Sequence, residues 1–473
     1  MDGLGGPAFT GDLVVDAGRI IEIGTDALAR FDAEQVIDAG GRVVAPGFID
    51  PHSHGDPFTT PMFENFLAMG VTTITLGQDG SSPETEDLSD WLDRVSGSGI
   101  GPNLAMFAGH GTLRTVSGIG MDPRPSATAI SELAERLDTA LDVAFGMSTG
   151  LEYNPGLHAS AAELEALARV VGRRDRVIMS HLRTEDDDKL ADAIGELVEQ
   201  GAHARVHIAH LKSVYGKGSA RAKEILDILA SARDGGVTIT ADTYPYSASY
   251  TGIGLLFPVW AKTTEQFLEA KSERRKELAD YLRQRVNLRN GPQATLLGTA
   301  PYTGKTLADL SRELELPFEE VLIEKLGPQG FSAAYFVMDE ALQSALLADP
   351  WVVISSDGGP GTYHPRGYGT FAKVIEDYVM SQKLLSLETA VAKMTSIPAD
   401  ILGIADRGRL ESGMVADVIL FDPQRVRARA SYTQPQILAE GFDLVMVNGR
   451  IVRRDGAMTG VVSGRVLRPA ASG

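Results

Sequence analysis

Apolar runs of four to seven residues recur along most of this chain, and segments with a helical period separate them. This alternation is typical of parallel strands that are joined by helical crossovers. The runs cover residues 43–49, 71–76, 104–108, 143–147, 176–179, 205–209, 237–241 and 351–354. Eight strands close a parallel barrel, so the pattern predicts an α/β fold of the (β/α)8, TIM-like kind.

Both ends of the chain have a different pattern, with short alternating runs and frequent turns. These runs cover residues 12–16, 19–24 and 35–38 near the start, and 416–422 and 443–452 near the end. Neither end alone offers enough strands to bury one face of a sheet. We therefore predict a small β-sandwich domain built from residues 1–44 and 407–473, with the barrel over residues 45–406.

One predicted crossover is much longer than a single helix requires. It runs from residue 246 to residue 350 and contains a charged helical stretch at 264–285 and a glycine-rich apolar run at 250–257. Long excursions from the catalytic face of a barrel often cover the active site. We expect an inserted, lid-like segment over about residues 250–345, before the last barrel strand.

Residues that bind metals or transfer protons follow the predicted strands. In such barrels the chemistry lies at the carboxyl ends of the strands. The residues there are His52 and His54, Gln78 and Asp79, His110, Glu152 and Tyr153, His181 and Arg183, His210 and Lys212, Asp242 and Tyr244, and Ser356 and Asp357. Five of the nine histidines are in this set, and we interpret the other four, His158, His203, His207 and His364, as surface or packing residues.

The first strand ends in a His-x-His pair. Residues i and i+2 of a strand point to the same face, so His52 and His54 would present two imidazoles side by side. This is half of a metal site. The alternative is a turn with two solvated histidines, and the ligand-type residues at the other strand ends favour the metal site.

The composition narrows the possible partners. The chain has 63 acidic and 44 basic residues and a net charge of −19, which would repel nucleic acid and anionic membranes. It has no cysteine, which excludes disulfides and thiolate ligands. No signal-like start and no apolar run of about 18 residues occurs, so we expect a cytoplasmic protein.

Taken together, the strand-end motifs resemble a known family. They are His52-Ser53-His54, 109–114, 150–156, Ser180-His181-Leu182-Arg183, His210-Leu211-Lys212, 242–246, Ser356-Asp357-Gly358 and 364–371. In this order they resemble the N-acyl-D-amino-acid deacylases, or D-aminoacylases, of the amidohydrolase superfamily. The resemblance implies a metal-dependent barrel with a terminal β-sandwich and an insertion before the last strand.

The resemblance also implies roles for individual residues. His181 and His210 would hold a tightly bound zinc, and His52 and His54 would hold a second, weaker metal. Asp357 would be the catalytic acid/base. The residues expected to bind the substrate's carboxylate and polar groups are Tyr153, Arg183, Lys212 and Arg366, and we add His110 and Tyr244 from their places at strand ends.

Asp79 marks a departure from the family pattern. Many members have a cysteine ligand in a Gly-Asn-Cys-Gly turn, whereas this chain has Gly77-Gln78-Asp79-Gly80. A carboxylate is a harder ligand than a thiolate and accepts zinc, manganese or cobalt with less discrimination. We predict that Asp79 is a metal ligand. The alternative is that Asp79 only caps a glycine-flanked turn.

Amide hydrolysis explains why these residue types would occur together. Zinc polarises a carbonyl and lowers the pKa of water to roughly 7, and a carboxylate such as Asp357 can carry the proton to the leaving nitrogen. Arg183 and Lys212 lie two residues beyond His181 and His210. Cations beside a metal suggest an anionic small-molecule substrate, unless they pair with Asp242 or Glu185.

Two other functions remain open from the sequence. A cyclic amidase acting on hydantoin- or dihydroorotate-like rings, or a dipeptidase, would typically have a carboxylated lysine at the end of the fourth strand. That strand ends in Met147-Ser148-Thr149-Gly150, without a lysine. A non-catalytic binding homologue would be expected to lose ligands, and here only the cysteine position has changed.

Overall fold

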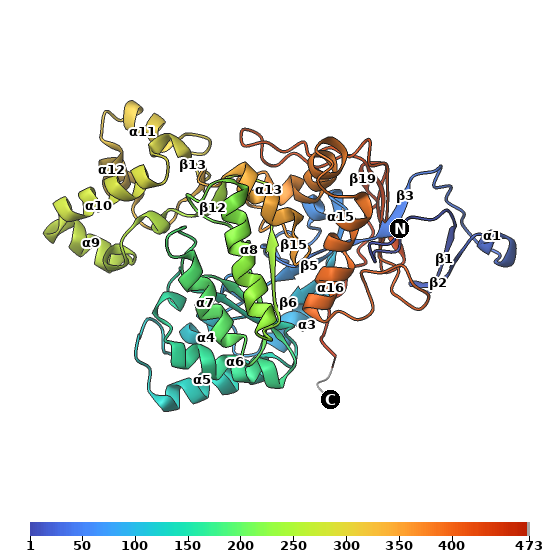
Figure 1. The fold of residues 1–473 in the computed structure, drawn as a ribbon, viewed down its shortest axis with the longest axis horizontal. Helices are drawn as coiled ribbons and strands as arrows, with labels where there is room; N and C mark the ends of the chain where they lie inside the picture. Colours follow the sequence, from blue (N-terminus) through green and yellow to red (C-terminus); the bar gives the residue numbers. More distant parts are fainter. Residues whose placement is uncertain (471–473) are drawn as a thin grey trace.

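Eight parallel strands form a closed barrel in the computed structural model, which describes residues 1–470 (Figure 1). In order around the barrel they are β4 (Phe48–Asp50), β5 (Val71–Leu76), β6 (Asn103–Met106) continued by β7 (Ala108–Gly109), β8 (Gly146–Gly150), β9 (Val177–His181), β10 (Arg205–Ile208), β11 (Ile239–Thr243) and β15 (Val352–Ile354). The ring closes just beyond β15, where Asp357 N donates to His52 O at 2.9 Å. The predicted TIM-like barrel is confirmed.

The burial of these strands explains why they could be predicted from apolar runs in the sequence. All six residues of β5 are buried, and β8 and β9 are buried along their whole length. Both faces of a parallel barrel are covered, so its strands read as continuous apolar or small-residue runs. The runs predicted at 143–147 and 237–241 begin too early, because Val143 and Val237 precede their strands and pack against the core.

The predicted strand at 43–49 is two strands that belong to different sheets. It breaks at Gly47, whose added Cβ would collide with the side chain of Thr72. Before the break, β3 (Val43–Pro46) pairs antiparallel with β16 (Val418–Phe421). After it, β4 pairs parallel with β5. The residues leading to His52 therefore tie the terminal sheet directly to the barrel.

Helices cover the outside of the barrel. Those between or after its strands are α2 (Glu64–Ala68), α3 (Leu88–Ser98), α4 (His110–Val116), α5 (Ala127–Ala140), α6 (Ala161–Arg173), α7 (Leu190–Gln200), α8 (Gly218–Asp234), α13 (Glu340–Ala348), α14 (Arg366–Lys373), α15 (Leu387–Met394) and α16 (Ser396–Leu402). In α5, Leu133 and Leu137 are buried and the Ser126 side chain caps the first turn. Such one-sided apolar stripes are what packing against a sheet requires.

Strands from both ends of the chain meet in one sheet, as the sequence predicted, and a separate hairpin lies near the start of the chain. A five-stranded antiparallel sheet has the order β19 (Ala457–Met458), β18 (Arg450–Arg454), β17 (Phe442–Val447), β16 and β3, and β1 (Asp12–Asp16) pairs with β2 (Arg19–Gly24). The strand predicted at 35–38 is wrong, because those residues pair with no other strand. The boundaries at 44 and 407 stay predictions, and residues 471–473 lie outside the described part of the chain.

The inserted segment has a sheet and a hydrophobic core of its own. Strands β12 (Ser249–Gly252), β14 (Ser332–Tyr335) and β13 (Thr295–Leu297) pair in that order. Helices α9 (Thr264–Glu273), α10 (Arg275–Leu288), α11 (Leu307–Glu313) and α12 (Phe318–Val321) pack around a cluster that includes Phe257, Leu282 and Val321. Figure 1 shows these helices projecting to one side, opposite the β1–β2 hairpin.

The helix predicted at 264–285 is interrupted at Arg274, which separates α9 from α10. Within residues 1–470, no helix combines the length and the apolar character needed to cross a bilayer.

Candidate metal centre

A cavity of about 230 Å³ lies where the carboxyl ends of the barrel strands meet the insertion. Its lining residues are His54, Asp79, Glu152, Tyr153, His181, Glu185, His210, Lys212, Tyr244, Ser249, Tyr250, Thr251, Leu255, Asp357, Thr362 and Arg366. Ser249, Tyr250, Thr251 and Leu255 come from the insertion, and most of the others follow barrel strands. The structure thus brings together most of the residues that the sequence singled out.

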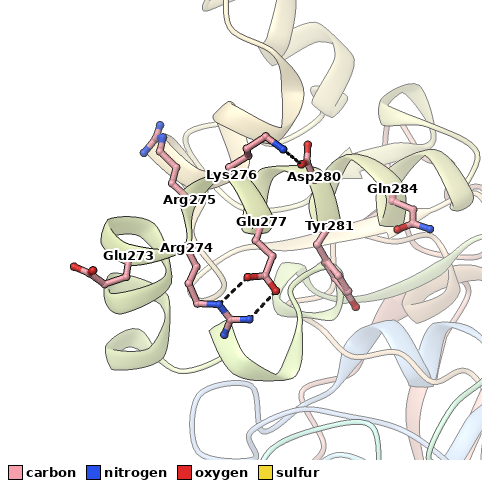
Figure 2. Close-up of a pocket in the computed structure, with 8 residues that line it drawn as sticks. All are labelled: Glu273, Arg274, Arg275, Lys276, Glu277, Asp280, Tyr281 and Gln284. Carbon is pink, nitrogen blue, oxygen red and sulfur yellow. Dashed lines mark hydrogen bonds and ion pairs between the residues drawn. The ribbon is translucent and has the colours of Figure 1, made fainter.

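A larger hollow, of about 630 Å³, lies on the surface of the insertion at the junction of α9 and α10 (Figure 2). Four of its charged side chains form two pairs along α10 and the residue before it. Arg274 binds Glu277 at 2.7 Å and Lys276 binds Asp280 at 3.1 Å. None of its lining residues is a histidine, and it lies on exposed helix faces, so the chemistry belongs to the smaller cavity.

The first group of metal-binding side chains consists of His52, His54, Asp79 and Asp357. One ligand atom from each lies within 4.8 Å of the others. His54 Nε2 is 3.1 Å from Asp357 Oδ1, and His52 Nε2 is 3.4 Å from Asp79 Oδ1. Imidazole nitrogens and carboxylate oxygens in this arrangement suit zinc and related divalent ions.

The second group consists of Asp79, His181 and His210, so Asp79 belongs to both. His210 Nε2 is 3.2 Å from Asp79 Oδ1, and His181 Nδ1 is 2.8 Å from His210 Nε2. The five residues predicted as ligands therefore converge on one centre, with the carboxylate of Asp79 between the two pairs of histidines. Their roles as ligands are taken up below as a proposal.

The residues present fit a bound metal. Both ring nitrogens of His52 are buried without a hydrogen-bond partner, which is costly unless another group binds them. Burial lowers the pKa of His54, but hydrogen bonds to Asp357 and Asp79 outweigh this and raise it to about 9. The negative potential that favours these protons also favours a divalent cation, which would displace them.

Three site residues adopt left-handed backbone conformations. The φ angles of Asp79, His210 and Asp357 are 53°, 37° and 48°. Such angles are uncommon outside glycine, and residues held in them concentrate at functional sites. Each of the three follows a barrel strand, so the turn directs its side chain or backbone toward the centre.

Asp242, on β11, interacts with the backbone of His210 and with the side chain of His207. Its Oδ1 accepts a hydrogen bond from the backbone N–H of His210 at 2.8 Å, and its Oδ2 lies 2.8 Å from His207 Nε2. The hydroxyl of Ser355 also donates to Asp242. All of these side chains are buried. His207, interpreted from the sequence as a packing residue, is thus part of the polar network behind the site.

Asp357 and Arg366 form a buried ion pair, with Arg366 Nη1 2.6 Å from Asp357 Oδ2. Burial alone would raise the pKa of Asp357, but Arg366 and the nearby imidazoles hold it well below its usual range. The guanidinium of Arg366 also lies 4.9 Å from the centre of the Tyr244 ring. Asp357 is therefore ionised and firmly oriented.

Lys212 pairs with Glu185, which was one of the alternatives open from the sequence. Lys212 Nζ donates to Glu185 Oε1, and both residues line the cavity. The sequence assigned Glu185 no place in the site, although it follows Arg183 by only two residues. Glu152, at the end of β8, also reaches the centre, with Oε2 3.2 Å from His181 Nε2.

The structure does not bring Arg183 and His110 into the cavity. Arg183 binds Glu196 at 2.8 Å and donates to the carbonyl of Leu157 at 2.8 Å. His110 is fully buried, with Nε2 2.8 Å from Glu163. Pairing with Glu196 was not among the partners considered for Arg183. Their predicted substrate contacts are therefore left out of the proposal below.

Residues 275–453 match the sequence model described as the Amidohydrolase family. The match includes the last barrel strand with Asp357 and Arg366, and three relatives that are 31–34% identical over nearly the whole chain define the protein as an amidohydrolase. Over nearly its whole length the chain is similar to these three curated proteins of Alcaligenes xylosoxydans xylosoxydans. It is 32% identical to N-acyl-D-glutamate deacylase (97% of this chain, 96% of the relative), 34% to N-acyl-D-aspartate deacylase (99% and 93%) and 31% to D-aminoacylase (100% and 96%).

Solved structures agree with these relatives. The N-acyl-D-glutamate deacylase of Bordetella bronchiseptica, complexed with zinc and a phosphonate mimic of the tetrahedral intermediate, gives a TM-score of 0.83 at 32% identity, covering 99% of this chain and 97% of that one. A D-aminoacylase described with a binuclear metal centre gives 0.85 at 29% identity, with the same coverage. The chain belongs to the N-acyl-D-amino-acid deacylase, or D-aminoacylase, family of the amidohydrolase superfamily.

Proposed function

We propose that this protein hydrolyses the amide bond of N-acyl-D-amino acids, giving a carboxylic acid and a D-amino acid. The observation that carries the proposal is the cluster in which Asp79 lies between two pairs of histidines and Asp357 lies beside Arg366. The relatives named above act on N-acyl-D-amino acids, and the chain matches them from end to end.

Two groups of ligands are proposed for the metal. His181, His210 and Asp79 would hold a tightly bound zinc, and His52 and His54 would hold a second, weaker divalent ion that shares Asp79. Zinc at such a site supplies Lewis acidity toward the amide carbonyl and lowers the pKa of water to roughly 7. The network around Asp242 keeps the ligand histidines oriented, as partners of metal ligands commonly do.

Asp357 moves the proton in this proposal. Because Arg366 holds Oδ2, the oxygen that would accept the proton lost by the attacking water is Oδ1, which faces the histidines 3.1 Å from His54 Nε2. The same carboxyl then delivers that proton to the nitrogen of the departing amino acid. A positioned acid/base residue of this kind contributes about 10²–10⁴-fold to the rate.

Arg366 and Lys212 are proposed to attract the carboxylate at the substrate's stereocentre. Both lie in the cavity beside the ligand residues. Burial raises the pKa of the Tyr153 and Tyr244 hydroxyls well above the ordinary value, so both stay protonated and can donate hydrogen bonds. A planar guanidinium beside these donors can fix the geometry of the carboxylate and thereby select one enantiomer.

The test is a comparison of N-acetyl-D-methionine, N-acetyl-L-methionine and the amide of the D-substrate with the zinc-loaded enzyme. We expect the D-substrate to be preferred and the amidated substrate, which lacks the carboxylate, to lose most activity. Equal rates on the two enantiomers would contradict the proposal and favour a cyclic amidase. The predicted absence of nucleic-acid and membrane partners and the cytoplasmic location stay predictions.

A further inference from the structure

We infer that the preferred substrates carry an uncharged side chain, and that the enzyme discriminates against N-acyl-D-glutamate and N-acyl-D-aspartate. This inference rests on the proposed function and concerns the part of the same cavity that would receive the side chain. It separates this chain from two of the relatives to which it is similar, which are named for acidic substrates.

Apart from the ions proposed for the metal centre, the cavity lining offers no unpaired cation to a second carboxylate. Four carboxylates line it, from Asp79, Glu152, Glu185 and Asp357. Among its lining residues the only lysine or arginine side chains are Lys212 and Arg366. Each of these already has a carboxylate partner, Glu185 and Asp357 respectively. In the proposed function both cations also interact with the substrate's α-carboxylate, so neither is available to a carboxylate on its side chain.

The wall contributed by the insertion is uncharged. It presents Ser249, Tyr250, Thr251 and Leu255 to the cavity. The hydroxyl of Thr251 lies 3.1 Å from that of Tyr153, so this wall touches the barrel side of the site. Leu255 is partly buried and packs against the insertion's hydrophobic core. An apolar or neutral polar side chain would find complementary surface here.

Two further cations, Lys262 and Arg285, lie outside the cavity lining. Lys262 donates to the backbone carbonyl of Glu152 at 3.4 Å but does not line the cavity, and burial lowers its pKa. Arg285 binds Asp186 at 2.5 Å. A side-chain carboxylate would therefore lose its water without gaining a lysine or arginine partner from the cavity lining.

Glutamine and glutamate provide matched substrates, because their side chains have nearly the same shape and differ in charge. We expect kcat/KM for N-acetyl-D-glutamine to exceed that for N-acetyl-D-glutamate by at least about 100-fold, since an unpaired charge in a desolvated pocket is strongly disfavoured. N-acetyl-D-methionine serves as an apolar substrate of similar length, and its kcat/KM should be close to that of N-acetyl-D-glutamine. A glutamate rate equal to or above the glutamine rate overturns the inference.

Substitution of Leu255 tests where the discrimination arises. Leu255→Arg places a cation on the insertion wall. It should lower the ratio of kcat/KM for N-acetyl-D-glutamine to kcat/KM for N-acetyl-D-glutamate at least tenfold, whereas Leu255→Met should leave this ratio unchanged. Lys262→Met should also leave the ratio unchanged. The inference would be contradicted if the wild-type enzyme hydrolysed the two substrates at comparable rates and Lys262→Met lost activity on N-acetyl-D-glutamate alone. That result would identify Lys262 as the partner of the substrate's side-chain carboxylate.

The same assays separate this inference from the proposed function. If the zinc-loaded enzyme hydrolyses none of the D-substrates, the proposed function fails and the inference fails with it. If it hydrolyses N-acetyl-D-glutamate as well as the neutral substrates, the proposed function holds and only the inference is overturned. If Leu255→Arg does not fold, the wild-type comparison of the two matched substrates still decides.

Discussion

Arg366 Nη1 lies 2.6 Å from one carboxylate oxygen of Asp357, while the other oxygen lies 3.1 Å from His54 Nε2. The two oxygens thus have different environments. One is anchored by a cation that comes from the start of α14, and the other faces the histidines. A carboxylate held in this way stays ionised and presents a single oxygen for proton transfer.

Removing the charge of Asp357 should separate catalysis from metal binding. We expect Asp357→Asn to lower kcat by at least about 10²-fold, the usual contribution of an acid/base residue, while the tightly bound metal is retained. Steady-state kinetics and metal analysis of the purified variant provide the measurement. Asp227→Asn, which removes an exposed carboxylate paired with Lys223, is the control and should behave as wild type. Near wild-type turnover in Asp357→Asn would reduce this residue to a structural role.

Asp79 should control metal content. Because its carboxylate lies between both pairs of histidines, Asp79→Ala is expected to lower activity and the amount of bound metal. Asp79→Cys should restore zinc binding at least partly, since a thiolate is a strong zinc ligand. The metal stoichiometry of the three proteins decides this point. An unchanged stoichiometry in Asp79→Ala would mean that the histidines hold the metal alone and that Asp79 only shapes its turn.

Asp242 should affect the metal without touching it. Asp242→Asn removes the charge that faces His207 and weakens the support of the His210 backbone. Loss of such a partner typically costs 10–100-fold in metal affinity. Competition with a chelator measures this, and Asp138→Asn, at a partly exposed ion pair with Arg174 outside the site, is the control. An affinity equal to wild type would show that the network serves only the barrel's packing.

Lys393 should make stability depend on pH. Burial lowers the pKa of this lysine to about 8 from 10.5, and its Nζ donates to the carbonyl oxygen of Asp349. Between pH 8 and 10.5 the unfolded chain binds this proton more tightly than the folded protein does, so the lysine's contribution to the free energy of unfolding rises across this window. Below pH 8 the lysine is protonated in both states, and the full free-energy cost of burying its charge destabilises the folded state.

Replacing Lys393 by methionine removes this dependence. The free energy of unfolding of Lys393→Met, relative to wild type, should fall by about 3 kcal/mol between pH 7 and pH 10.5. Denaturant titrations followed by tryptophan fluorescence at several pH values measure the difference. Lys276→Met, at an exposed position on α10, should show no such trend. A pH-independent difference for Lys393→Met would contradict the lowered pKa.

The barrel and the residues at its strand ends could be predicted because both depend on local sequence. Fully buried strands such as β5 are apolar over their whole length, and the residue after each strand lies at a known edge of the barrel. The division of 43–49 between two sheets could not be predicted, because it depends on β16, which lies hundreds of residues away. The ion pair between Arg183 and Glu196 likewise could not be predicted, because it depends on how α7, which carries Glu196, packs against the barrel.

The cavity wall was the least predictable part of the site. Tyr250 and Leu255 belong to the glycine-rich apolar run at the start of the predicted lid-like segment, but the sequence did not show which of its residues would face the ligands. No pattern of spacing or charge links them to His181 or Asp357.

The separate hydrophobic core of the insertion has a consequence for how this protein can change over generations. Residues such as Leu255 are supported by that core, whereas the ligand residues stand on the barrel. A substitution that alters the insertion wall therefore need not disturb the scaffold that holds the metal. Selection can therefore change which substrate side chain is accepted while the residues that break the amide bond are inherited unchanged.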